Sequence, residues 1–189
     1  MKKDIKEKIL NSAEELISSL GYRKTALIDI AKKAGISKSA MYYYFDSKAE
    51  ILLEVIKKDL QAFKMKLEPI INETSSPSEK LEKFIITKVS HLSLLKNSYT
   101  TIVDEYLENY RFIEKALEDF SNYEKYLIQK ILDEGVKKGE FEINEKFDPA
   151  RTIHLALIGL EKTLFIDNHH GIEEVSRNFA QLIIKGIKK

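Results

Sequence analysis

The chain has 189 residues, 43% of them apolar, and a formal net charge of +1. This length and composition suffice for one or two compact units with a buried core. The absence of cysteine excludes disulfides and thiolate metal sites, and the lack of a long uncharged apolar run argues against a membrane span or signal peptide. We therefore expect a cytoplasmic protein. Because Leu, Ile, Lys and Glu dominate while Pro and Gly are few, we expect it to be all-α.

The first predicted helix covers residues 3–20 and ends at Gly21. Its apolar side chains recur every three to four residues, which places them on one buried face. We expect this face to consist of Ile5, Ile9, Ala13, Leu16, Ile17 and Leu20.

Two short helices follow, over residues 26–34 and 38–45, separated by a tight turn. Gly35 ends the first, since glycine tolerates the left-handed backbone of a helix C-terminus, and Ser37 caps the second. The candidate core positions of the first are Ile28, Ile30, Ala31 and Ala34, and those of the second are Met41, Tyr44 and Phe45.

The opposite face of the second short helix is suited to DNA. Turning the helix by about 100° per residue brings together Lys38, Ser39, Tyr42 and Tyr43, with small Ala40 between them. Small side chains let a helix approach base edges, while lysine and tyrosine bind phosphate oxygens. Residues 1–48 also hold ten Lys or Arg against six Asp or Glu, whereas residues 49–189 are net acidic.

This segment closely resembles the DNA-binding signature of TetR-type (tetracycline-repressor-like) bacterial transcriptional regulators. The matching positions are Thr25, Ile30, Ala31, Ala34, Gly35, Ser37, Tyr42, Tyr44, Phe45, Ser47 and Lys48. The resemblance implies a three-helix helix-turn-helix domain over residues 1–48 and a helical ligand-binding and dimerisation domain over residues 49–189. It implies DNA contacts from Thr25, Ser37, Lys38, Ser39, Ala40, Tyr42, Tyr43 and Lys48.

The second part of the chain contains further helix signals, for about nine helices in all. Ser47 and Glu50 form a capping box at the start of a fourth helix, which Pro69 limits. A second capping box, Ser76 to Glu79, starts a fifth helix that runs to about residue 96. The remaining helices are expected at residues 99–108, 112–138, 149–166 and 172–187, with no strand and no internal repeat.

The last two helices predict a homodimer. Residues 155–166 are apolar nearly all the way round, so two faces need cover. One face packs against the core of the chain itself, and the other packs against a second copy of the chain. The last two helices of each copy then form a four-helix interface. The expected interface residues are Ala156, Gly159, Leu160, Thr163, Val175, Phe179 and Leu182. A buried central helix in a monomer is the alternative.

Aromatic and polar residues in the middle of the chain suggest a pocket for a small molecule. We expect it to be lined by Phe63, His91, Tyr99, Tyr106, Tyr110 and Tyr123, with His154, Ile158 and Glu161 from one face of a later helix. In the alternative, His154 is a core histidine with satisfied hydrogen bonds, and Glu161 lies at an edge. His169 and His170, together with His91, have no metal-ligand spacing, so no metal is expected, and no other cofactor is expected either.

The leading hypothesis is therefore a ligand-responsive transcriptional repressor. Two copies of residues 25–48 bind a pseudo-palindromic operator, and a hydrophobic, aromatic or fatty-acyl effector releases them. An enzyme that uses His91 and His154 as acid/base groups is disfavoured, because the chain has no phosphate loop, nucleophile elbow or metal motif. A helical protein–protein adaptor is the third alternative.

Overall fold

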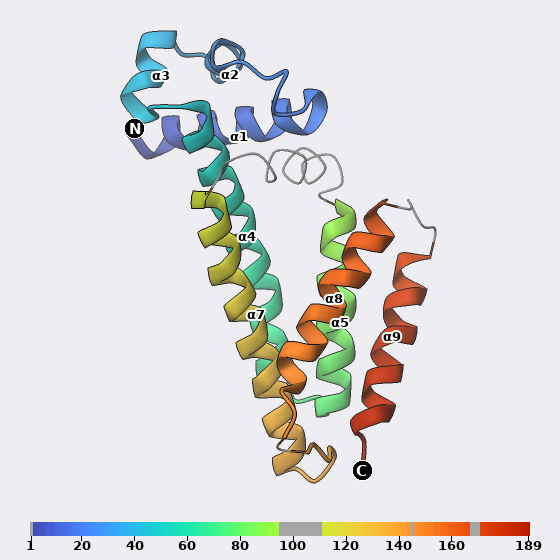
Figure 1. Cartoon of the computed structure of the whole chain (residues 1–189). Coiled ribbons are helices and arrows are strands. Elements are labelled where there is room, and N and C mark those ends of the chain that lie inside the picture. Colours follow the sequence, from blue (N-terminus) through green and yellow to red (C-terminus); the bar gives the residue numbers. More distant parts are fainter. Residues whose placement is uncertain (1, 95–110, 145, 167–170) are drawn as a thin grey trace. The chain divides into compact units, whose positions relative to one another are not determined.

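The protein is built from α-helices, as the sequence predicts. The computed structural model describes residues 2–94, 111–144, 146–166 and 171–189. Its helices are α1 (Lys2–Leu20), α2 (Leu27–Ala34), α3 (Lys38–Tyr44), α4 (Lys48–Asn72), α5 (Pro77–Leu94), α7 (Arg111–Lys137), α8 (Pro149–Ile166) and α9 (Ile172–Ile187) (Figure 1). Within these residues β-structure is limited to one bridge between Phe141 and Lys188. The helix predicted at residues 99–108 lies outside the described residues.

The chain divides into two compact units, and α4 contributes to both. Unit 1 contains residues 1–61 with 95–117, and unit 2 contains residues 62–94 with 118–189. The division at residues 48 and 49 remains a prediction about function. None of the described helices is long and apolar enough to cross a membrane.

Unit 1 buries one face from each of α1, α2, α3 and the first half of α4. Its core includes Ile9, Ala13, Ile17, Ile30, Ala31, Met41, Phe45, Ile51 and Leu52. The predicted faces are confirmed except at two positions: Leu20 is 49% exposed and Ile28 is 55% exposed. In α2 the buried face consists of Leu27, Ile30 and Ala31. Ile28 follows Leu27 directly, so its side chain is turned about 100° away from Leu27 and points to solvent.

The helix boundaries follow the local sequence signals. Gly21 and Gly35 have φ values of 83° and 71°, the left-handed conformation expected after a helix end. Ser37 Oγ accepts a hydrogen bond from the Ala40 N–H at 3.1 Å, which confirms the cap of α3. The Ser76–Glu79 capping box is also present, since the Ser76 N–H donates to Glu79 Oε2 at 2.7 Å and the Glu79 N–H donates to Ser76 Oγ at 3.3 Å.

Two details of α4 differ from the prediction. The Glu50 N–H donates to Ser47 Oγ as expected, but the Glu50 carboxylate accepts from the Asp46 N–H rather than from that of Ser47. Pro69 lies inside α4, which continues to Asn72. The extra turn buries Ile70, and this burial offsets the hydrogen bond that proline cannot make.

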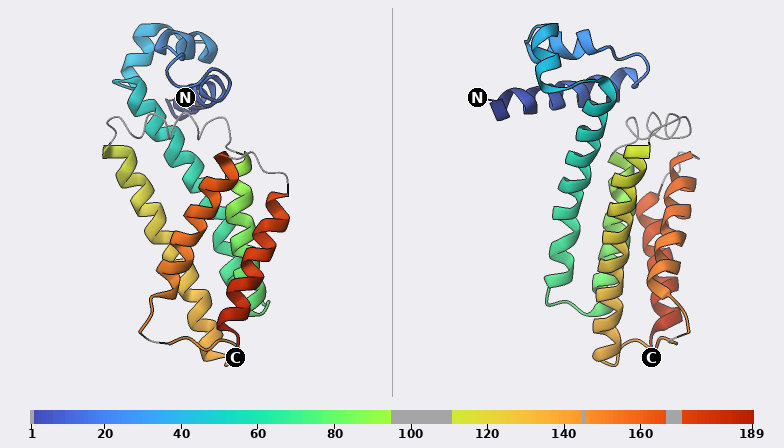
Figure 2. Two further views of the ribbon diagram at one scale, coloured as in Figure 1. Left: turned by 45° about the vertical axis from the view of Figure 1, so that its right-hand side comes forward. Right: turned by 60° about the vertical axis from the view of Figure 1, so that its left-hand side comes forward.

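Unit 2 is a set of helices around an apolar core. α5 packs against α9 and α8, and these three helices lie side by side in both views of Figure 2. The inner face of α9 consists of Ser176, Ala180 and Ile184. Small side chains at the first two positions allow close approach of the helices. α5, α7 and α8 contribute Leu81, Phe84, Ile85, Ile128, Ile131, Leu132 and Leu157 to the core.

Candidate nucleic-acid interface and effector site

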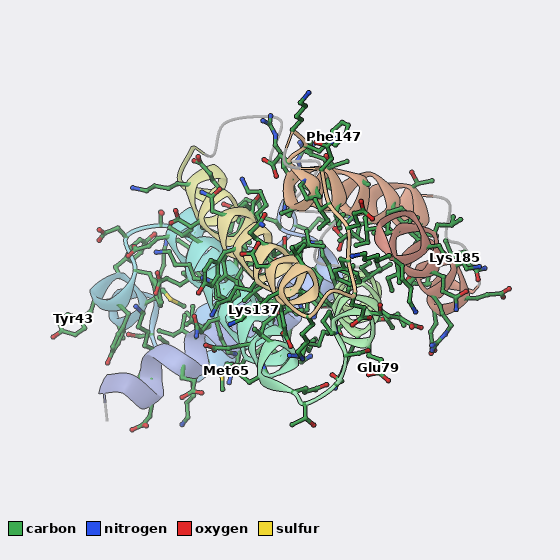
Figure 3. The ribbon with its side chains drawn as sticks, turned by 90° about the horizontal axis from the view of Figure 1, so that it is seen from below. Tyr43, Met65, Glu79, Lys137, Phe147 and Lys185 are labelled. Carbon is green, nitrogen blue, oxygen red and sulfur yellow. The ribbon has the colours of Figure 1, made fainter. Side chains whose placement is uncertain are left out.

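α3 presents a polar and aromatic face to solvent while its other face is buried. Met41 and Phe45 are fully buried, whereas Lys38, Ser39, Tyr42 and Tyr43 are exposed. Tyr43 is 67% exposed and extends away from the helix, as Figure 3 shows. Tyr42 is 47% exposed, so both tyrosines lie on the solvent side of α3. The predicted DNA-facing residues Lys38, Ser39, Ala40, Tyr42 and Tyr43 thus share one short helix.

Two other residues predicted to touch DNA hold the loop between α1 and α2. Thr25 is 1% exposed, and its hydroxyl donates to the Gly21 carbonyl at 2.8 Å, so it is not on the surface. Lys48 Nζ donates to the carbonyl oxygens of Tyr22 and Thr25 at 2.8 and 3.0 Å and lies 3.9 Å from the centre of the Tyr22 ring. Thr25 and Lys48 thus support this loop, and their contacts with DNA stay predictions.

Unit 2 contains a buried polar cluster contributed by α5, α7 and α8. Lys88 Nζ lies 2.5 Å from Glu124 Oε1 and 3.3 Å from Glu161 Oε1. His154 Nε2 lies 3.2 Å from Glu124 Oε2 and 3.2 Å from Ser121 Oγ. Lys88, Glu124, His154 and Glu161 are all buried. We refer to these four residues as the Lys88 cluster.

The electrostatics of the Lys88 cluster follow from two carboxylates facing one ammonium. Burial alone would raise the pKa of Glu124, but Lys88 and the bond from His154 together hold that pKa below its usual range. Burial alone would lower the pKa of Lys88, but the attraction of Glu161 and Glu124 keeps it above its usual value. For Glu161, burial outweighs the more distant Lys88 and raises the pKa to about 7. Near neutral pH, Glu161 is therefore the site where the cluster binds or releases a proton.

Several of the predicted pocket residues come together next to this cluster. The Phe63 and His91 rings are stacked, with centroids 3.8 Å apart, and Phe120 lies 5.6 Å from Phe63. Tyr123 is 6.4 Å from Phe120, and Lys64 lies over its ring at 4.7 Å. Tyr99, Tyr106 and Tyr110 lie outside the described residues. The aromatic side chains of Phe63, His91 and Phe120 thus lie beside the Lys88 cluster within unit 2.

The three predicted pocket residues on α8 do not share one environment. His154 and Glu161 are buried, which excludes the edge position considered for Glu161, whereas Ile158 is exposed. The buried face of α8 is centred between His154, Leu157 and Glu161, and Ile158 is turned to its border. There it lines a groove of about 690 Å³ between α7 and α8, whose wall also includes Ser121, Lys125, Tyr126, Gln129, Asp148, Ala150, Arg151, His154 and Leu155.

The predicted dimerisation residues lie on the outer faces of α8 and α9. Ala156, Gly159, Thr163 and Val175 are exposed, and Leu160 and Phe179 are half-buried. Leu182 is 71% exposed. A side chain added at Gly159 would meet no atom within 4 Å, so the surface of α8 is open at this point. α8 therefore has one buried face and one apolar face in solvent.

Lys88 and Glu124 were not among the predicted site residues, although both carry a recognisable signal in the sequence. Each falls on the buried side of its helix, Lys88 between Ile85 and Val89 on α5, and Glu124 between Phe120 and Leu127 on α7. Opposite charges at buried positions of neighbouring helices indicate a pair. No group of acidic, His or Cys residues in the described parts of the chain could hold a metal ion.

Comparisons with known proteins agree with this arrangement. Residues 9–55 match the family described as "Bacterial regulatory proteins, tetR family". The chain is 28% identical over 185 residues to the fatty acid metabolism regulator protein of Bacillus subtilis, which covers 95% of this chain and 93% of the relative. It is 45% identical over 53 residues to IcaR of Staphylococcus aureus, the negative transcriptional regulator of the biofilm operon icaADBC, covering 28% of each chain.

A solved structure is similar along nearly the whole chain. The transcriptional regulator FadR from Bacillus subtilis, crystallised in complex with stearoyl-CoA, superposes with a TM-score of 0.73 at 25% identity. The match covers 96% of this chain and 98% of that chain. The all-α fold with an N-terminal helix-turn-helix is thereby confirmed, and all three similar proteins are named as regulators rather than enzymes.

Proposed function

Because this chain belongs to the tetR family of bacterial regulatory proteins, we propose that it is a cytoplasmic transcriptional repressor that binds its operator as a homodimer. The observation that carries this proposal is the exposed face of α3 above the buried Met41 and Phe45. A short helix fixed from behind and polar in front is suited to the major groove.

In this proposal, the bases are read by side chains of α3. Ser39, Ala40, Tyr42 and Tyr43 approach base edges and phosphates, and Lys38 binds phosphate. Ser37 acts by capping the helix, and its hydroxyl also lies 3.0 Å from that of Ser39. Thr25 and Lys48 act indirectly, since they fix the loop that precedes α2.

The homodimer is supported by the exposed apolar faces of α8 and α9. Ala156, Gly159, Leu160 and Thr163 on α8, with Val175, Phe179 and Leu182 on α9, form the interface in this proposal. Two chains place two α3 helices on successive turns of DNA, and their contacts then add. Repression rather than activation is supported by the similarity to the negative regulator IcaR over 53 residues.

The effector in this proposal is a small hydrophobic molecule, and a fatty-acyl compound is the first candidate. This choice is supported by the similarity to a fatty acid metabolism regulator and to a FadR structure that contains stearoyl-CoA. The ligand-binding residues we propose are Phe63, His91, Tyr99, Tyr106, Tyr110, Tyr123, His154 and Glu161, with Ile158 at the rim of the groove.

Residues 1–48 act as the DNA-binding domain and residues 49–189 as the ligand-binding and dimerisation domain. α4 is one helix, and its two halves belong to the two compact units. An effector that favours a different position of α4 changes the separation of the two α3 helices. By linkage, the effector then loses affinity on operator-bound protein by the same factor by which it weakens operator binding.

Binding of the full chain to the DNA upstream of its own gene, measured over a salt series, tests this proposal. A Lys38→Ala variant is expected to bind more weakly, with a salt slope lower by about one for each half-site, because one phosphate contact per chain is lost. The control is Lys137→Ala, which removes an exposed lysine from the end of α7 in unit 2 (Figure 3). Equal slopes for both variants would remove Lys38 from the interface, and absence of binding at low salt would refute the proposed function.

A further inference from the structure

The Lys88 cluster has one polar group whose bonding is incomplete. Glu161 is only 8% exposed, yet its Oε1 makes no hydrogen bond of acceptable geometry to any described residue. Its neighbour Lys88 lies 3.3 Å away and is already held by Glu124 at 2.5 Å. A buried carboxyl oxygen that has an ion-pair partner but no well-formed hydrogen bond is costly, and a ligand or water can complete it.

The state of Glu161 decides what kind of group would complete the site. Since burial raises the pKa of Glu161 to about 7, this side chain carries a proton over much of the range below neutral pH. A protonated carboxyl donates one hydrogen bond through its O–H, and the Lys88 ammonium has three N–H donors. Lys88 on α5 and Glu161 on α8 lie 3.3 Å apart and both have donor capacity, so a group that completes them is an acceptor.

Charge balance selects among acceptors. With Glu161 protonated, the positive charge of Lys88 and the negative charge of Glu124 cancel within this trio. An uncharged oxygen preserves this balance, whereas a carboxylate would add a buried negative charge and an ammonium would require Glu161 to ionise. The aromatic residues lie close at hand, because His91 follows Lys88 by one turn and Phe120 precedes Glu124 by one turn.

We propose that the Lys88 ammonium and the Glu161 carboxyl together bind one uncharged carbonyl oxygen of the effector, that of an ester, thioester or amide. This inference rests on the effector-responsive function proposed above and specifies the chemistry of its polar end. Glu124 and His154 are positioning residues: Glu124 holds Lys88, and His154 holds Glu124 through Nε2 at 3.2 Å. The apolar chain of the effector lies against Phe63 and Phe120.

Binding of this kind is coupled to protonation. A carbonyl oxygen that accepts from the Glu161 O–H stabilises the neutral form and so raises the pKa of Glu161 further. Affinity is then constant at pH below about 7 and falls above it, by up to tenfold per pH unit. The charged groups that face Glu161 among the described residues are Lys88 from α5 and Glu124 from α7, with His154 next to Glu124.

The test uses the full chain without DNA and three probes with the same ten-carbon chain, whose length is chosen for solubility. The probes are the uncharged decanoyl thioester of N-acetylcysteamine, decanoate and decylamine. Calorimetric titration is expected to show preference for the thioester and a loss of its affinity above pH ~7. In Glu161→Gln, whose amide donates at every pH, that loss is expected to disappear.

Two further variants separate recognition from folding. Lys88→Met is expected to weaken thioester binding at every pH, because the ammonium donor is gone. Glu118→Gln changes an exposed carboxyl on the same helix as Glu124, and it is expected to keep the pH dependence of the wild-type chain. Circular dichroism and operator binding of each variant establish that it is folded.

Preference for decylamine with affinity rising through pH ~7 would overturn the inference in favour of a cation site. Preference for decanoate, or an unchanged pH dependence in Glu161→Gln, would overturn it as well. In these cases operator release by a probe would leave the proposed repressor function intact. If no probe binds at any pH, the inference falls, and failure of the chain to bind operator would be the separate sign that the repressor function falls too.

Discussion

Replacing Glu161 by Gln is expected to stabilise the unliganded protein at neutral and alkaline pH. The pKa of Glu161 is about 7 in the folded chain against an ordinary value of 4.5. The folded state therefore binds this proton more tightly than the unfolded state does. At about 1.4 kcal/mol per pKa unit, the difference is worth about 3 kcal/mol.

The sign of the pH dependence follows from this difference. Below pH ~4.5 both states are protonated, and the carboxyl and the amide are expected to be nearly equivalent. Between pH ~4.5 and ~7 the wild-type chain loses up to about 3 kcal/mol relative to the variant, and the difference is constant at higher pH. The pKa of Glu124 is lowered and acts in the opposite sense, but it is common to both proteins and cancels in the comparison.

Urea unfolding followed by circular dichroism, at one protein concentration and over a series of pH values, measures this difference. Glu118→Gln, which changes an exposed carboxyl, serves as the control and is expected to give a flat profile. A flat profile for Glu161→Gln, or a wild-type chain that gains stability over the variant as the pH rises, would show that Glu161 is not a buried neutral acid.

Three further predictions concern the DNA-binding unit and the dimer. Lys48→Met removes the ammonium that donates to the carbonyls of Tyr22 and Thr25, so the free energy of unfolding is expected to fall by about 1–3 kcal/mol in urea titrations. No change would remove Lys48 from the support of this loop. Ser37→Ala removes the cap of α3 and is expected to cost about 1 kcal/mol, with weaker operator binding by gel shift, whereas unaltered binding would argue against α3 as the reader. Leu182→Glu is expected to yield monomers in sedimentation velocity, because it places a charge in the apolar interface. The control is Met65→Glu, which is expected to leave the dimer intact; Met65 is 68% exposed and Leu182 is 71% exposed. Monomers in the wild-type chain would contradict the interface.

Most of the fold was predictable because its signals are local. Gly21, Gly35, Ser37 and the Ser76–Glu79 capping box each act through a few neighbouring backbone groups, and the structure has a helix boundary at every one of them. Pro69 was misleading, because burial of Ile70 depends on packing that the local sequence does not encode.

The candidate site was predicted less completely because its residues act across helices. The exposed face of α3 follows from the rotation of one helix, so its residues could be identified in advance. Lys88 and Glu124 were harder to identify in advance, because each is buried as the ion-pair partner of the other, and the two are 36 positions apart in the sequence. Ile28 and Ile158 were predicted to be buried or to line a pocket, but both are exposed. Each lies one position from a buried face, and the centre of that face is determined by packing against other helices.

Hydroxyl-radical footprinting of the DNA upstream of the chain's own gene tests the central claim most directly, because it reports where two α3 helices lie on the duplex. We predict two protected patches on one side of the DNA, about 34–36 Å or one helical turn apart, that are both lost in Tyr42→Ala combined with Tyr43→Ala. A single patch, no protection, or protection that survives in the double variant would contradict the account.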